Sequence, residues 1–210
     1  MEHAVNLLGI KYTVNIVSGL LLRKTIEESD GKNPSNYWDS PTNVSMVAAN
    51  ITRSIGYGDP DKMYVIGLFH NASHALLTYR FPDYNEFLDD NLNHQELLIT
   101  ELEDRHYNTD HALLGFHLSN TWGLEPDFSE VIKQHHNIQA ILSQTSEEVS
   151  DKGIMLSILK MAEHVDKLFW GMSPDWEWER IESSILDYMG MSKPDFDDLT
   201  SDMMDKLISG

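Results

Sequence analysis

Apolar residues recur at three- and four-residue spacing along most of this chain, the spacing that places side chains on one face of an α-helix. No convincing pair of strands is apparent. Helices are therefore expected at residues 4–28, 43–55, 63–77, 94–106, 111–122, 126–137, 152–170, 174–189 and 195–208. The pattern predicts an all-α fold, a compact multi-helix bundle of about eight or nine helices.

Capping residues and prolines mark several helix starts. Asn93 and Glu96 have the spacing of a capping box, in which each side chain bonds to the backbone N–H of the other residue. Pro126 suits the first position of a helix, because the N–H that proline lacks would be unpaired there. Residues 138–150 are expected to form a loop or short linker.

The segment 63–77 is almost wholly apolar but carries the polar pair His70-Asn71 at its centre. Burying a polar group without a partner costs roughly 2–7 kcal/mol, so such a pair is expected to have a specific role. An aspartate at position 71 would indicate a dinuclear metal hydrolase. Asn71 offers only a neutral carbonyl oxygen, without the negative charge or the bridging capacity of a carboxylate.

Composition and charge exclude several classes of protein. The chain has no cysteine, and therefore no disulfide, thiolate nucleophile or Cys-ligated zinc. Its 34 acidic and 15 basic residues give a formal charge of −19, which disfavours nucleic acid and anionic membranes as partners. The start of the chain lacks the features of a signal peptide, and no apolar stretch reaches the ~20 residues of a membrane span. We expect a soluble, cytoplasmic protein.

Four of the 10 histidines lie at helix ends or within apolar helices, namely His70, His111, His135 and His136. Glu163 follows in the helix expected at 152–170. A hydrolytic metal site needs neutral imidazoles and carboxylates that converge from several helices, and a two-metal site also needs a bridging carboxylate. The histidines alone therefore do not indicate a catalyst.

Four segments carry a resemblance to a known family. The first, MEHAVNLLGIKYTVNIVSGLLLR (1–23), is similar to a helix of the pattern AIxxLGxxxxxxLVLxxxL. FHNASHALL (69–77) is similar to the LLHD or LLHN segment of the HD superfamily. The stretch TDHALLGFHLSNTWGLEPDFSEVIKQHHN (109–137) is similar to the pattern DHxxxGxxLxxxWxLPxxIxxxIxxHH, and MAEHVDKLF (161–169) to a closing ADxLA helix. These patterns are those of the HDOD domain, the HD-related output domain of bacterial signalling proteins. The resemblance covers about the whole chain and implies an HD-type bundle.

The resemblance also implies a set of metal positions, because the catalytic relatives bind metal through histidines and aspartates at these places. Two of the positions have changed here: the first histidine falls near Ser40, and Asn71 replaces the bridging aspartate. Asp166, one turn after Glu163, is an alternative for the last carboxylate. The candidate or vestigial metal ligands are His70, Asn71, His111, His135, His136 and Glu163.

We therefore expect a non-catalytic regulatory domain in bacterial signal transduction, which acts on a protein partner and is able to form a homo-oligomer. No cofactor is expected beyond a residual divalent metal ion. On this interpretation the surviving histidines hold the core together through hydrogen bonds.

Two alternatives remain open. The first is a metal-dependent phosphohydrolase acting on a nucleotide or cyclic dinucleotide, with Glu163 as the carboxylate. The second is a ligand-sensing pocket in which a small anion meets His111, His135 and His136.

The resemblance places an HDOD-like core at residues 1–140, with the C-terminal helices of 141–210 completing or extending the same domain. The family pattern extends upstream through several more helices. We therefore expect either that the N-terminal lobe of the family is absent or that the chain is a fragment of a longer protein.

Overall fold

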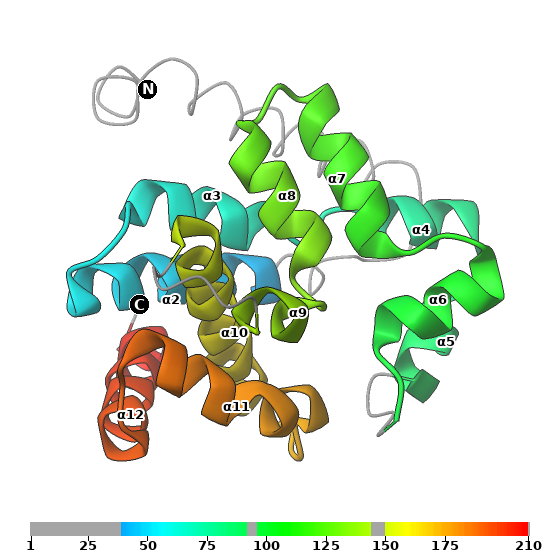
Figure 1. The fold of residues 1–210 in the computed structure, drawn as a ribbon. Helices are drawn as coiled ribbons and strands as arrows, with labels where there is room; N and C mark the ends of the chain where they lie inside the picture. Colours follow the sequence, from blue (N-terminus) through cyan, green and yellow to red (C-terminus); the bar gives the residue numbers. More distant parts are fainter. Residues whose placement is uncertain (1–38, 92–95, 144–149, 210) are drawn as a thin grey trace.

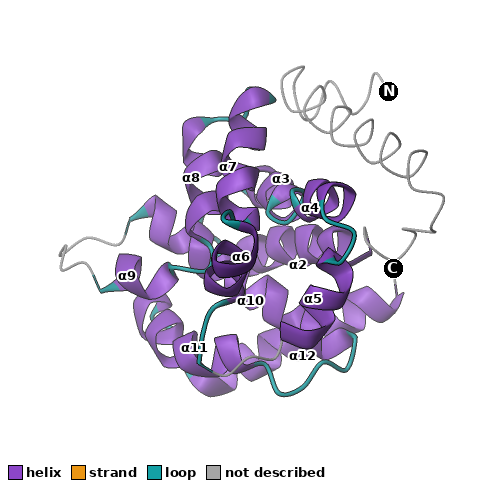
Figure 2. Cartoon of the chain, turned by 90° about the vertical axis from the view of Figure 1, so that its right-hand side faces the viewer, coloured by secondary structure: helices purple, strands orange, loops and turns teal. Residues whose placement is uncertain are grey.

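The computed structural model describes residues 39–91, 96–143 and 150–209, which are helical and contain no strand (Figures 1 and 2). The helices are α2 (Asp39–Ile55), α3 (Pro60–Phe69), α4 (His74–Arg80), α5 (Tyr84–Asn91), α6 (Ile99–Tyr107), α7 (His111–Thr121), α8 (Pro126–Gln134), α9 (Ile138–Leu142), α10 (Asp151–Phe169), α11 (Trp176–Met189) and α12 (Lys193–Ser209). The all-α class is confirmed. No helix in the described part of the chain is long and apolar enough to span a bilayer.

The described residues contain more helices than the eight or nine expected. The spacing of apolar residues did not predict the short helices α4, α5 and α9 as separate elements. The segment 63–77 divides into α3 and α4 around His70-Asn71, where the Ser73 hydroxyl donates to the His111 carbonyl at 2.5 Å and fixes the turn against α7. Helix α5 was not expected. Helix α9 lies in the segment assigned to a loop, where Ile138 is buried in the core.

The start of α6 also differs from the expectation. The helix begins at Ile99, and the Glu101 carboxylate accepts a hydrogen bond from the Leu98 backbone N–H at 2.9 Å. Glu96 therefore precedes the helix, while its expected partner Asn93 lies outside the described residues, as does the helix expected at 4–28. Pro126 occupies the first turn of α8 as expected.

Helix α10 forms the centre of the core (Figure 1). It packs against α2 and α3 on one side and against α8, α9, α11 and α12 on the others. Its apolar positions, including Leu156, Ile158 and Leu159, are fully buried. Lys160, Glu163 and Asp166 recur every three residues along it and are also buried, so this central helix carries charged groups into the interior.

Several helix ends meet beside α10. His70 is the C-cap of α3, His111 is the first residue of α7, and His135 is the C-cap of α8. Helix α11 begins nearby and carries Glu177 in its first turn. The bundle therefore brings side chains far apart in sequence to one place.

The contact between α2 and α3 depends on Gly67. A Cβ at this position would lie 2.7 Å from the Ser45 Cα and 2.9 Å from its backbone nitrogen. Gly115 of α7 is also close to its neighbour, but there the nearest atom is a side-chain methyl of Ile132 at 2.8 Å. A backbone cannot rotate away as a side chain can, so the two glycines differ in how well they tolerate a methyl group.

We expect Gly67→Ala to lower the free energy of unfolding by about 1–3 kcal/mol, the usual cost of overpacking a core. Gly115→Ala is the matched control and should cost less, since Ile132 is able to shift. Urea unfolding followed by circular dichroism measures both values. Equal stabilities of the two variants would contradict a backbone contact between α2 and α3 at Gly67.

Candidate metal and ligand site

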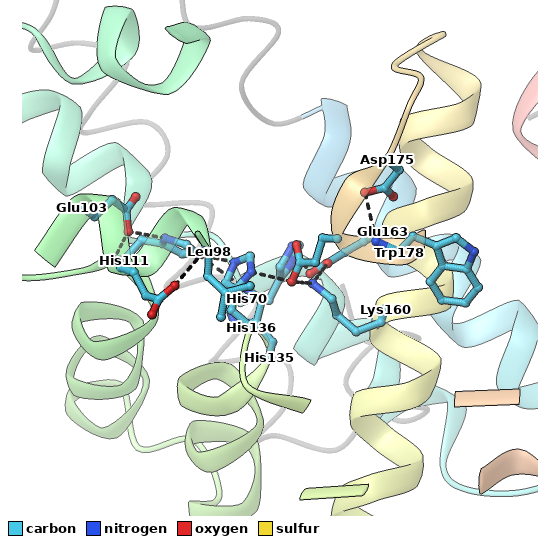
Figure 3. Close-up of polar contacts among 12 residues, drawn as sticks. His70, Leu98, Glu103, His111, His135, His136, Lys160, Glu163, Asp175 and Trp178 are labelled. Carbon is cyan, nitrogen blue, oxygen red and sulfur yellow. Dashed lines mark hydrogen bonds and ion pairs between the residues drawn. The ribbon is translucent and has the colours of Figure 1, made fainter. Parts of the chain in front are cut away.

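A cavity of about 120 Å³ opens where these helix ends meet. Its lining includes Ser40, His70, Asn71, His74, His111, His136, Glu163, Asp166 and Glu177. Figure 3 shows polar groups in a row across this region, with Glu103 and His111 at one end and Lys160 and Glu163 toward the other. The structure therefore brings the sequence-predicted residues together, but it divides them into two groups.

The first group is a cluster of three imidazoles. The Nε2 atom of His111 lies 3.3 Å from Nε2 of His135 and 3.0 Å from Nε2 of His136. One nitrogen atom from each of the three rings lies within 4.8 Å of the corresponding atoms of the other two. Since His135 is fully buried and His136 nearly so, this cluster is shielded from bulk water.

In His135 and His136, which follow α8, the other ring nitrogen faces a hydrogen-bond acceptor. His135 donates from Nδ1 to the carbonyl oxygen of Ile132 at 2.6 Å, and His136 donates from Nδ1 to a carboxylate oxygen of Glu177 at 2.8 Å. An imidazole that is neutral and protonated at Nδ1 has a lone pair at Nε2. Burial lowers the pKa of both histidines, which favours this neutral form.

His111 is held in the same way by Glu103, which is fully buried. One carboxylate oxygen of Glu103 accepts from the His111 ring Nδ1 at 2.7 Å and from its backbone N–H at 2.9 Å. The hydroxyl of Tyr84 donates to the other oxygen, and His74 Nδ1 lies 2.5 Å from that hydroxyl. Burial alone would raise the pKa of Glu103, but the charge and hydrogen bond of His111 outweigh it and hold the pKa at about 2.

The second group contains His70 and the acidic residues of α10. His70 donates from Nδ1 to the Gly67 carbonyl at 2.7 Å, and its Nε2 lies 3.4 Å from Oε1 of Glu163. Burial lowers the pKa of His70 to about 4, so the ring is neutral at physiological pH. Asn71 is only partly buried and lines the cavity.

Asp166 is tied to neutral donors. The Ser40 hydroxyl donates to one of its oxygens at 2.5 Å, while the Asn43 amide and the Trp170 indole donate to the other at 2.9 and 3.1 Å. Burial raises the pKa of Asp166 in spite of these bonds. Ser40, at the position of the expected first histidine, therefore lies at the cavity and occupies a carboxylate oxygen that a metal ion would need.

Sequence reasoning did not identify Tyr84, Glu103, Lys160 and Glu177 as part of the site. Glu103 and Glu177 are two of many acidic residues in helical segments, and their burial leaves no signal in the sequence. Lys160 lies in an apolar stretch of α10, ILKMAEHV, which is the one sequence signal that could have drawn attention to it. His74, which was not identified either, lines the same cavity as His70, and its ring stacks on His111 with ring centroids 4.2 Å apart.

The residues present do not fit a two-metal centre. Such a centre requires an anionic ligand shared by two ions, whereas Asn71 offers a neutral amide and Asp166 is hydrogen-bonded to Ser40. The carboxylates of Glu163 and Glu177 are already paired with Lys160. The three-histidine cluster does fit a single ion, because three imidazole nitrogens with oriented outer partners are typical of zinc sites.

Comparison with known proteins agrees with the fold. Residues 1–138 match the family model of the HDOD domain, and the chain therefore belongs to the HDOD family. The search of curated proteins finds no match.

Solved structures give the same class. An HDOD domain protein of unknown function from Geobacter sulfurreducens matches with a TM-score of 0.59 and 18% identity over 84% of this chain and 60% of its own. A protein from Shewanella amazonensis described as a "putative phosphohydrolase" matches with a TM-score of 0.64 and 17% identity, over 98% of this chain and 72% of its own. The MmoQ response regulator from Methylococcus capsulatus matches with a TM-score of 0.55 and 19% identity, over 80% of this chain and 62% of its own. The chain thus spans about 60% of the first of these proteins.

The burial of His70 predicts a pH-dependent stability. Its folded pKa of about 4 lies below the ordinary value of 6.5, so the unfolded chain takes up a proton first as the pH falls through 6.5, and stability is lost progressively down to about pH 4. His70→Asn should remove on the order of 3 kcal/mol of this loss, although the variant is less stable at pH 7.

Urea unfolding at several values between pH 4 and pH 7 measures the effect. His74, His135 and His136 contribute losses of the same sign and remain in both proteins, so the variant should show a shallower slope rather than none. His117→Asn, on the exposed face of α7, is the control. Parallel profiles for His70→Asn and the parent would show that His70 does not titrate in this way.

Proposed function

We propose that this chain is a non-catalytic regulatory module of bacterial signal transduction. The observation that carries the proposal is the replacement of an anionic bridge by Asn71, beside an Asp166 whose oxygens are bonded to Ser40, Asn43 and Trp170. Without a shared anionic ligand, the cavity lacks the means to position two ions and an activated water for phosphoester hydrolysis. Most of its acidic oxygens are instead bonded to neighbouring side chains.

The proposed mode of action is contact with a protein partner. HDOD membership and the similarity in fold to the MmoQ response regulator support a place in signalling. The charge of −19 favours a partner with a basic surface over nucleic acid or an anionic membrane. We also propose a cytoplasmic location, because a chain without cysteine fits a reducing compartment in which disulfides are rare.

A second candidate role is supported by the three-histidine cluster. His111, His135 and His136 are oriented by Glu103, the Ile132 carbonyl and Glu177, which is the arrangement of outer partners that metal-binding imidazoles use. We propose that this cluster holds a single transition-metal ion such as Zn²⁺. The ion would link α7 to the end of α8 and so stabilise the bundle.

The single-ion proposal predicts that metal-free protein binds one Zn²⁺ per chain and that its thermal midpoint rises with Zn²⁺ concentration. His135→Ala should reduce the affinity at least about tenfold and abolish most of the rise, because it removes one of three ligands. Elemental analysis and calorimetric titration provide the measurements. His117→Ala serves as the matched control, and Zn²⁺ binding that survives His135→Ala would place the ion elsewhere.

The regulatory proposal predicts no hydrolysis above background when the chain is incubated with a panel of nucleotides, cyclic dinucleotides and synthetic phosphodiesters in the presence of Mn²⁺, Fe²⁺ or Mg²⁺. In parallel, the tagged chain should retain a specific protein from extracts of its native cells in stoichiometric amount. Turnover that is abolished by His135→Ala would contradict the proposal and establish the phosphohydrolase alternative.

A further inference from the structure

Lys160 is a lysine in the interior of the bundle, with 3% of its surface exposed. It lies in the middle of α10, and its ammonium nitrogen is 2.5 Å from Oε2 of Glu163 and 2.7 Å from Oε1 of Glu177. The two glutamates come from different helices, α10 and α11. The ammonium therefore joins these helices beside the cavity, as the close-up in Figure 3 shows for Lys160 and Glu163.

Both glutamates also face a histidine. Oε1 of Glu163 lies 3.4 Å from Nε2 of His70 and accepts no hydrogen bond from the described residues. Oε1 of Glu177 accepts from Nδ1 of His136 at 2.8 Å. Both carboxylates line the cavity, so oxygen and nitrogen atoms suited to a divalent ion are present on this side of it.

Two buried carboxylates this close together need a compensating positive charge, because leaving an ion unpaired in the interior costs several kcal/mol. Lys160 is placed to supply it to both, since its ammonium lies 2.5 Å from Glu163 and 2.7 Å from Glu177, whereas His70 and His136 each face only one of the two. Burial alone would lower the pKa of Lys160, but Glu163 and Glu177 outweigh that effect and raise it. The ammonium therefore stays charged.

We infer that Lys160 is an internal counter-cation: its ammonium gives Glu163 and Glu177 the positive charge that a divalent ion would otherwise give them, and it thereby keeps this side of the cavity free of metal. An ordinary structural ion pair would stabilise the bundle without any bearing on ion binding. An internal counter-cation has a further consequence, because its removal creates a site for an ion.

The inference is tested with Lys160→Met, which keeps the length and apolar character of the side chain and removes its charge. We introduce it together with His135→Ala, so that an ion bound at the three-histidine cluster does not enter the measurement. Mn²⁺ is the probe, since carboxylates and imidazoles both bind it. The readouts are the Mn²⁺ affinity and the rise in thermal midpoint between EDTA and Mn²⁺.

We expect the Lys160→Met protein to bind Mn²⁺ at least tenfold more tightly than the His135→Ala parent and to gain thermal stability from it. Adding Glu177→Gln to Lys160→Met should abolish the gain, because one of the two carboxylates is then neutral. Lys167→Met is the matched control on the same helix. Lys167 pairs with Asp175 at 2.8 Å and acts on Glu177 only through its more distant charge, so its removal should raise the Mn²⁺ affinity far less than the removal of Lys160.

The inference is overturned if the Lys160→Met protein is folded in EDTA and Mn²⁺ neither binds more tightly nor raises its thermal midpoint. It is also overturned if the variant is unfolded in EDTA and Mn²⁺ does not restore its fold. Retention of the response after Glu177→Gln overturns it as well, since the ion would then lie elsewhere. The result is independent of the Zn²⁺ proposal, which is measured with His135 intact. Either proposal is therefore able to fail while the other stands.

Discussion

The arrangement of the site depends on three imidazole nitrogens that point at one another. His111, His135 and His136 present Nε2 atoms separated by 3.0 and 3.3 Å along the two measured pairs, while each Nδ1 is held by an outer acceptor. A proton or a cation between these nitrogens stabilises the arrangement, because otherwise their lone pairs face one another. Burial disfavours a proton on His135 and His136, and three imidazoles with oriented outer partners suit a metal ion.

This constraint explains why several helix ends are fixed where they are. Glu103 of α6 orients the first residue of α7, and Glu177 of α11 orients the residue that follows the C-cap of α8. Lys160 of α10 then binds Glu177 and Glu163, and Glu163 faces His70 at the end of α3. A row of polar contacts therefore connects α3, α6, α7, α8, α10 and α11 through the interior of an otherwise apolar bundle.

The sequence predicts the all-α class and the long helices well, because their apolar faces repeat at helical spacing over many residues. Short helices such as α4 and α9 are poorly predicted, since fewer than two turns give the pattern too few positions to repeat. For the site, the histidines were identified from their places at helix ends and from the resemblance to the HDOD domain. Glu103, Glu177 and Tyr84 were not, because only tertiary packing distinguishes a buried acid from the many exposed ones.

The division of the cavity into a histidine side and a carboxylate side has a chemical meaning. One side offers neutral nitrogen ligands to a cation, while on the other Lys160 already balances the charge of the glutamates. On our proposals this cavity holds at most one ion. The neutral amide of Asn71, which cannot bridge two ions, and the internal ammonium of Lys160 both favour that outcome.

Anomalous diffraction from crystals of the full chain grown in excess Zn²⁺ and Mn²⁺ tests this account most directly. The account predicts a single peak at about 2.0–2.1 Å from the Nε2 atoms of His111, His135 and His136, and none beside Asn71. Two fully occupied peaks roughly 3.5–4 Å apart, with Asn71 in contact with both, would contradict it.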